Sequence, residues 1–284
     1  NAKAAERKQA DPAPDYSEGR EKHRQYIAEC AERLRETPDF DETRLMVVDY
    51  LAARGISEDE AVALGIGYDP KPARGWQDEA GEWHKTPRII LPWLGCDFYH
   101  IDRAIDARAK GGKYDKPPSA PDHDKGITEA DCVGPQPLYN PDAFSHDYIV
   151  VVEGVLDAIA VQLCGFNAVA LGGTASNNFA NEAAARNYAG VVIDMLDADG
   201  KPDETNKGRG AGNKLVSLLA EAGIKTLPRA EYGIEETDDY SGHKDAAEWF
   251  AADRADLAEM LCERTGMKRV FFGNSGAEAN ECAI

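Results

Sequence analysis

The second half of the chain alternates between short apolar runs, rich in β-branched residues, and segments with the period of an amphipathic helix. The apolar runs predict strands at about residues 148–152, 167–171, 190–196 and 223–227. The helical segments cover about residues 154–164, 178–188 and 211–222. Strands that alternate with helices of about ten residues are typical of βαβ units. The pattern therefore predicts an α/β domain in which helices flank a parallel sheet.

The first half has mainly helical periodicity, followed by two extended segments. Helical patterns cover residues 20–36, 43–54 and a short segment from Ser57 to about residue 67. Ser57 and Glu60 have the spacing of a capping box. Residues 87–93 and 97–103 have the composition of strands, and the turn between them at Leu94-Gly95 indicates an antiparallel hairpin. We therefore predict a small helical and antiparallel-strand subdomain, of α+β type, before the parallel sheet.

Composition places the chain among globular proteins. It has 284 residues, 43% of them hydrophobic and 29% charged. No apolar run approaches the roughly 20 residues that span a bilayer, and the N-terminus is polar rather than a signal peptide. The six cysteines contain no Cys-x-x-Cys pair, so we expect a reduced, cytoplasmic protein without a zinc site. Because the first residue is Asn, we suspect a fragment or a processed form.

The net charge of −19 argues against non-specific binding of nucleic acid, which depends on Lys and Arg neutralising phosphates. The distribution of charge changes this picture. Acidic residues crowd 194–204 and 231–239, whereas basic residues recur over 85–116. The chain could bind nucleic acid despite its negative net charge if the acidic part held cations and the basic part held phosphates.

Carboxylates follow the predicted strands of the second half. Glu153 comes directly after the first strand, with Asp157 one helical turn later. Asp197 and Asp199 follow the third strand, and Asp245 follows the fourth. Because the carboxyl ends of parallel strands meet at one edge of a sheet, we expect these groups to converge. Oxygen ligands without histidine favour a hard cation, Mg²⁺ or Mn²⁺.

Each acidic residue also has an ordinary interpretation, because an Asp-x-Asp pair is common in loops and a carboxylate is favoured at a helix start. Their occurrence at successive strand ends favours the metal site. Asp194 competes for the ligand role, but it falls inside the apolar strand, so we favour Asp197 and Asp199.

These segments resemble the Toprim domain of bacterial-type DNA primases. The resemblance is strongest to the primases of phages and mobile elements. The Toprim-like segments are residues 150–158, 168–174, 196–199 and 244–248. Segments that resemble the N-terminal half of the primase RNA-polymerase core are residues 50–56, 64–68, 87–93, 102–103, 113–114 and 137–140. The resemblance extends over about residues 20–255. It implies a Toprim parallel sheet with the small subdomain before it.

The resemblance implies roles for individual residues. Glu153 would be a metal-associated and proton-handling catalytic carboxylate, with Gly154 and Asp157 in support. The other expected metal ligands are Asp197, Asp199 and Asp245. A basic groove for template or incoming triphosphate would be lined by Arg88, Arg103, Lys113 and Lys244. The backbone of Gly172-Gly173-Thr174 would either approach a phosphate or form a plain tight turn.

The implied function is synthesis of RNA primers by metal-dependent nucleotidyl transfer. The implied partners are single-stranded DNA, ribonucleoside triphosphates and a replicative helicase, either fused or separate. There are two alternatives. One is a Toprim nuclease or topoisomerase-like enzyme, and the other is an inactive DNA-binding module fused to a helicase. One departure from the family is the long segment 200–209 after Asp199.

Composition and motifs divide the chain into four predicted parts. They are a linker at 1–18, the N-terminal primase subdomain at 19–146, the Toprim domain at 147–257 and a foreign-looking tail at 258–284. Residues 265–284 resemble a class-III, acetylornithine-type aminotransferase, in which Ser275-Gly276-Ala277 would contact the phosphate of pyridoxal phosphate. The chain lacks an identifiable Schiff-base lysine and the rest of that fold, so we expect the tail to pack poorly.

Overall fold

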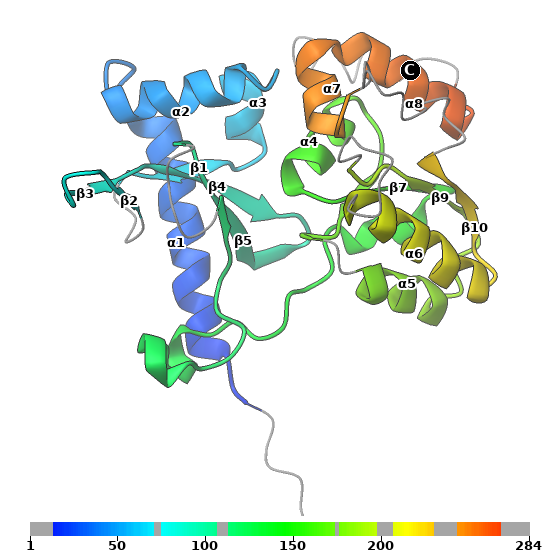
Figure 1. The fold of residues 1–284 in the computed structure, drawn as a ribbon, viewed down its shortest axis with the longest axis horizontal. Helices are drawn as coiled ribbons and strands as arrows, with labels where there is room; N and C mark the ends of the chain where they lie inside the picture. The colour runs from blue at the N-terminus through cyan, green and yellow to red at the C-terminus, as the bar shows by residue number, and fades with distance from the viewer. Residues whose placement is uncertain are drawn as a thin grey trace, which may run out of the picture.

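Two sheets of different type organise the molecule, as the computed structural model shows (Figure 1). The structure describes residues 14–70, 75–106, 113–173, 176–197, 207–229 and 243–267. The N-terminal part carries an antiparallel sheet, and the C-terminal part carries a parallel sheet with helices on both faces. This arrangement confirms the predicted fold class.

The C-terminal sheet has the strand order β10–β9–β7–β8, and all its pairings are parallel. Its strands are β7 (Tyr148–Val152), β8 (Ala168–Ala170), β9 (Val191–Asp194) and β10 (Lys225–Leu227). The four residues Ile149 to Val152 have no exposed surface, because β7 lies between two strands and under helices on both sides. A strand buried on both faces explains the continuous apolar run in the sequence.

Helices cover both faces of this sheet (Figure 1). They are α4 (Val155–Leu163), α5 (Ser176–Ala185), α6 (Lys207–Glu221), α7 (Ala246–Ala252) and α8 (Arg254–Thr265). The helix α4 packs against α7 on one side, and α5 packs against α6 on the other. The sequence pattern predicted α4, α5 and α6, but α6 begins at Lys207, four residues earlier than the predicted start at 211.

The N-terminal sheet has the order β1–β4–β5–β6 and is antiparallel throughout. Its strands are β1 (Gly67–Asp69), β4 (Arg88–Trp93), β5 (Cys96–Ala104) and β6 (Tyr114–Asp115). The predicted hairpin is β4–β5, and Gly95 supplies its turn with a φ of 84°. A separate hairpin is formed by β2 (Gly75–Gln77) and β3 (Trp83–Lys85). The sequence pattern did not predict the short strands β1, β2, β3 and β6, none of which is longer than three residues.

Three helices accompany the antiparallel sheet. They are α1 (Ser17–Glu36), α2 (Glu42–Ala52) and α3 (Glu58–Ala63). The capping box predicted for α3 is present, because the Ser57 side chain accepts from the Glu60 amide while the Glu60 side chain accepts from the Ser57 amide. The helix α1 lies along one face of the sheet, where Gly67 leaves room for the backbone of Cys30. Short 3₁₀ helices follow at His123–Lys125, Glu129–Asp131 and Pro141–Ser145.

The two parts share one hydrophobic core and several polar contacts. Leu91 and Trp93 of β4 belong to the same buried cluster as β7 and α4. The guanidinium of Arg254, at the start of α8, lies 2.7 Å from the Glu60 carboxylate and also donates to the Leu163 carbonyl. These contacts connect the C-terminal helix to α3 and to the end of α4.

The helix α8 crosses residue 258, where the sequence analysis placed the start of a separate tail. Leu257 and Leu261 of α8 are fully buried in the common core, so the predicted boundary at 257 divides a helix that is continuous to Thr265. The aminotransferase-like segment after Met267 lies outside the described residues, as do residues 1–13 of the predicted linker. The five cysteines in the described ranges are free thiols. Among the described helices, none has both the length and the apolar character needed to cross a membrane.

We predict that Leu261→Ala lowers the free energy of unfolding by about 2–5 kcal/mol, because it opens a cavity beneath α8. Urea denaturation followed by circular dichroism measures the change. Glu259→Ala is the matched control, since Glu259 is exposed on the same helix. Equal stability of the two variants would show that α8 does not pack as the structure describes.

Candidate functional site

A pocket of about 270 Å³ lies where the carboxyl ends of β7 and β9 face the antiparallel sheet. One wall is acidic and is formed by Glu153, Asp157, Asp197 and Asp245. The other charged lining residues are Arg54, Arg103, Lys113 and Lys244. The acidic residues all come from the C-terminal part, whereas three of the four cations come from the N-terminal part. The pocket therefore exists only because the two parts are joined.

Glu153 is placed by the end of β7. Its backbone carbonyl accepts from the amides of Gly172 (2.9 Å) and Gly173 (3.3 Å), which fixes the turn after the strand. Gly154 follows as the N-cap of α4, and its amide donates to Asp157 Oδ2 at 3.1 Å. A Cβ at position 154 would lie 2.7 Å from that oxygen, so a side chain there would displace the Asp157 carboxylate. The predicted supporting residues thus shape the segment that carries Glu153.

Asp157 is buried and connects two helices. Its Oδ1 accepts from the Ala247 amide at 3.0 Å, which ties the first turn of α4 to the first turn of α7. Burial raises the pKa of Asp157 well above its usual range, and the carboxylates of Asp245 and Asp197 raise it further. Such repulsion among close carboxylates is relieved when a cation binds between them.

The two acidic residues around the end of β9 face different ways. Asp194 is the last residue of β9, is only 6% exposed, and accepts from the Leu196 amide at 3.0 Å. Its other oxygen packs against Gly212 of α6. Asp197 lines the pocket, and its Oδ2 lies 3.5 Å from the Lys244 ammonium. The structure therefore places Asp197 and not Asp194 in the pocket, while Asp199 lies outside the described residues.

A buried arginine that the sequence analysis did not identify holds the last acidic segment in place. Arg229 follows β10 and is 6% exposed. It donates to the carbonyl of Leu196 at 2.6 Å and to that of His243 at 2.9 Å. Asp245, the N-cap of α7, is two residues beyond His243 and accepts from the Glu248 amide at 2.7 Å. Arg229 therefore joins the loop before Asp197 to the loop before Asp245.

The basic side of the pocket is built on β5, β6 and the end of α2. Arg103 of β5 donates to the hydroxyls of Tyr50 and Tyr114. The pKa of Lys113 is lowered by burial, and by the neighbouring charges of Arg103, Arg54 and Lys244 in addition. The lowered pKa of Lys113 is consistent with an excess of positive charge at this wall. Of the four, Arg54 was not predicted as a site residue.

Arg88 was expected in the same basic groove, but the structure places it elsewhere. It pairs with Ala104 across the β4–β5 ladder, whereas Arg103 pairs with Ile89, so Arg88 and Arg103 point to opposite faces. Arg88 is 2% exposed and donates to the Asp102 carbonyl at 3.2 Å. Strand alternation therefore turns Arg88 toward the face covered by α1.

The Gly172-Gly173 segment forms a tight turn. Its two amides donate to the Glu153 carbonyl, so they are used within the fold and not presented to a phosphate. The Gly172 carbonyl accepts from the Lys116 ammonium, which attaches this turn to the end of β6. Thr174, the third residue of this segment, lies outside the described residues.

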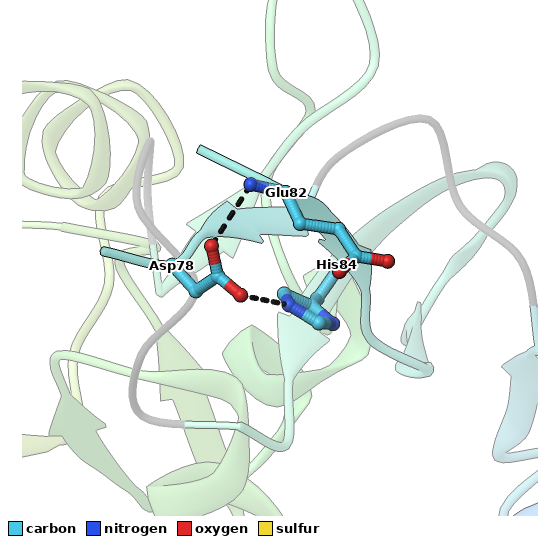
Figure 2. Close-up of side chains that lie close together, drawn as sticks. All are labelled: Asp78, Glu82 and His84. Carbon is cyan, nitrogen blue, oxygen red and sulfur yellow. Dashed lines mark hydrogen bonds and ion pairs between the residues drawn. The ribbon is translucent and has the colours of Figure 1, made fainter. Parts of the chain in front are cut away.

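A second group of possible metal ligands lies on the β2–β3 hairpin (Figure 2). Asp78 Oδ1 accepts from the amides of Ala80 (3.0 Å) and Glu82 (2.8 Å). Asp78 Oδ2 lies 3.0 Å from His84 Nε2, and Figure 2 shows this contact and the one with the Glu82 amide. These are the hydrogen bonds of an Asp-initiated turn. They account for the cluster as a turn-stabilising arrangement.

Comparison with known proteins agrees with the two-part architecture. Residues 150–241 match a family model described as Toprim-like. The sequence matches no curated protein. The described fold is similar to that of the Aquifex aeolicus primase, solved with its zinc-binding and RNA polymerase domains, with a TM-score of 0.56 and 18% identity. That match covers 86% of this chain and 61% of the Aquifex chain, so this chain spans less than two thirds of it.

The fold is also similar to the RNA polymerase domain of Mycobacterium tuberculosis primase DnaG. The TM-score is 0.53 at 16% identity, and the match covers 95% of this chain and 92% of that domain. A second structure of the same domain, in complex with double-stranded DNA, gives a TM-score of 0.54 at 16% identity and covers 88% and 81% of the two chains. Residues 150–241 are therefore Toprim-like, and the fold of the chain is similar to that of primase RNA polymerase domains.

We predict that Arg229→Gln lowers the free energy of unfolding by about 1–3 kcal/mol, because it leaves buried carbonyls without a donor. Hydrogen exchange should be faster at the amides of residues 244–248 than in the unaltered chain. Lys225→Gln removes an exposed charge from the adjacent strand and is the control, with both properties unchanged. Unaltered exchange at 244–248 in Arg229→Gln would contradict the role of Arg229.

Proposed function

We propose that this chain is the catalytic core of a DNA primase, which synthesises RNA primers from ribonucleoside triphosphates on single-stranded DNA. The observation that carries the proposal is the pocket in which Toprim carboxylates face cations of the antiparallel part. The fold likeness to primase RNA polymerase domains supports it, because both parts of the chain have counterparts there. The DNA complex of the Mycobacterium tuberculosis domain makes DNA the first partner to test.

The acidic wall fits a hard divalent cation, Mg²⁺ or Mn²⁺. Its side-chain donors are carboxylates, and burial, together with the charges of Asp245 and Asp197, raises the pKa of Asp157. Glu153, Asp197 and Asp245 would hold the cation, with Asp199 as the further expected ligand. A divalent cation in a nucleotidyl-transfer site activates the attacking hydroxyl and stabilises the leaving pyrophosphate.

The chain's own side chains supply the remaining functions. Arg103 and Lys113 place fixed positive charge on the wall opposite the carboxylates, where phosphate oxygens would lie. Arg103 cannot rotate freely, because both its Nε and a terminal nitrogen contact tyrosine hydroxyls. A preorganised cation stabilises developing phosphate charge without a reorganisation cost. Glu153, held by the turn after β7, is positioned to accept a proton within the same pocket.

The alternative enzyme is a strand-cutting Toprim protein, which would use a tyrosine hydroxyl as nucleophile. Tyr114 lines the pocket, but its hydroxyl accepts from the Arg103 guanidinium. Nicked plasmid or a covalent DNA adduct would favour this alternative over primer synthesis. A chain that binds DNA but binds no Mn²⁺ in calorimetry would instead be the inactive binding module.

We predict that Glu153→Gln reduces template-dependent ribonucleotide incorporation by about 100-fold or more, because the neutral amide binds a cation more weakly than a carboxylate and cannot act as a base. The measurement is incorporation of labelled ribonucleotides on single-stranded DNA with Mg²⁺ or Mn²⁺. Glu182→Gln, an exposed carboxylate on α5 that forms an ion pair with Arg186, is the control. Undiminished incorporation by Glu153→Gln would refute the proposed catalytic role of the pocket.

We also predict that Mn²⁺ raises the melting temperature of the chain, because it binds only the folded carboxylate cluster. At a concentration about 100 times the dissociation constant, the stabilisation is about 2.7 kcal/mol. Asp197→Asn should lose at least half of the shift, whereas Asp142→Asn, on the Pro141–Ser145 3₁₀ helix, should keep it. Equal shifts in both variants would place the cation outside this pocket.

A further inference from the structure

A polar contact joins the antiparallel part of the chain to the turn beside Glu153. Lys116 directly follows β6, and its ammonium donates to the Gly172 carbonyl and, at 2.8 Å, to Gln136 Oε1. Gln136 Nε2 in turn donates to the Leu171 carbonyl at 2.9 Å. Two successive carbonyls after β8 are therefore held from the antiparallel part. We call the contacts among Lys116, Gln136 and Gly172 the Lys116 clamp.

The clamped turn is connected directly to Glu153. The amides of Gly172 and Gly173 donate to the Glu153 carbonyl, so a displacement of this turn would move the backbone of Glu153. Gly172 has a φ of 68°, and a Cβ there would lie 2.8 Å from the ring of Trp93 and 2.9 Å from Gln136 Nε2. The turn is thus packed closely between Trp93 and the Lys116 clamp, which leaves it little room to shift.

The surroundings of Lys116 favour a positioning role over that of a solvated surface charge. Both of its acceptors, the Gly172 carbonyl and the Gln136 amide oxygen, are uncharged. Burial lowers the pKa of Lys116, an effect that full solvation of the ammonium would remove. A hydrogen bond from a charged donor is stronger than one between neutral groups. The ammonium is therefore a strong attachment point for the turn.

The basic wall of the pocket does not depend on the Lys116 clamp. Lys113 lines the pocket three residues before Lys116, and its carbonyl accepts from the Ala104 amide of β5 at 3.0 Å. The next residue, Tyr114, pairs with Arg103 across the β5–β6 ladder. Loss of the Lys116 ammonium would therefore release the clamped turn and leave the cations of the pocket in place.

We propose that Lys116 is a positioning residue, which holds the Gly172 turn and so sets the position of the Glu153 carboxylate opposite the basic wall. The proposal rests on the proposed function and adds a residue that acts through the turn and not by contact with substrate. A misplacement of about 1 Å in a catalytic site can lower a rate roughly 100-fold. Because the cations stay in place, the loss should fall on kcat and not on the KM for nucleotide.

The kinetic test compares Lys116→Met with the unaltered chain in primer synthesis. We expect kcat to fall about tenfold and the KM for nucleotide to change by less than about twofold. Lys116→Arg should recover about half or more of the lost rate, because a guanidinium keeps the charge and can donate to both oxygens.

Two further measurements do not depend on catalysis. Hydrogen exchange at the amides of Gly172 and Gly173 should be about threefold faster or more in Lys116→Met, because these amides bond to the Glu153 carbonyl in the clamped turn. The dissociation constant of Mn²⁺, measured by calorimetry, should rise about threefold or more, because Glu153 is no longer held beside the other carboxylates.

Lys22→Met is the matched control. Lys22 and Lys116 line the same cavity of about 600 Å³, but the Lys22 ammonium lies 3.2 Å from Glu18 and 3.6 Å from Asp131. Its substitution makes the same change in net charge and should leave kcat, the exchange rates and the Mn²⁺ affinity unchanged. Thermal melting of each variant shows whether the fold is retained.

Unchanged exchange at Gly172 and Gly173 in folded Lys116→Met would overturn the proposal. Faster exchange with unchanged kcat would also overturn it, since the turn would then not position Glu153, and would leave the proposed function standing. A raised KM with unchanged kcat would make Lys116 a substrate contact instead. If the unaltered chain makes no primers, the proposed function fails, and the exchange and Mn²⁺ measurements still decide whether Lys116 positions Glu153.

Discussion

The burial of one carboxylate beside two others at the end of the parallel sheet is the constraint on which the geometry of the pocket depends. Asp157 is the extreme case, because it is buried beside Asp197 and Asp245 and its pKa is raised for that reason. The fold tolerates this arrangement because backbone amides of Gly154 and Ala247 donate to Asp157. Those two hydrogen bonds also hold the first turns of α4 and α7 together. The groups that create the electrostatic cost therefore also set the geometry of the pocket.

The antiparallel part supplies what the Toprim-like part lacks. The acidic residues of the pocket come from the C-terminal part, which alone could hold a cation but would repel a phosphate. Arg103 and Lys113 bring the opposite charge from β5 and the start of β6, and Arg54 brings it from the end of α2. A chain with a net charge of −19 can thus present a local cationic wall, because charge is segregated between its two parts. The shared core and the Arg254–Glu60 ion pair fix the position of the acidic wall relative to the basic wall.

The sequence predicted the features that depend on local pattern. Continuous apolar runs identified β7 to β10, and the position of Glu153 and Asp157 directly after one such run marked them as site residues, which both line the pocket. Features that depend on contacts between distant segments could not be predicted in the same way. Arg229 bonds to carbonyls of two different loops, and the buried face of α8 merges with the core, although no local pattern marks either one. Arg88 shows a third case: its residue type fitted a phosphate site, but strand alternation turns it away from the pocket.

The carboxylate pocket adjoins a second cavity of about 440 Å³ between the end of α2 and α7. Four charged residues, Arg54, Lys113, Lys244 and Asp245, line both cavities, so a ligand in either one would change the electrostatic potential in the other. A divalent cation on the carboxylates would reduce the attraction that the acidic wall exerts on Lys244, whose ammonium lies 3.5 Å from Asp197. Lys244 would then be available to an anion, and a bound anion would in turn favour the cation. Because coupling between two binding equilibria is reciprocal, a cation on the carboxylates and an anion on the basic wall would each bind more tightly in the presence of the other.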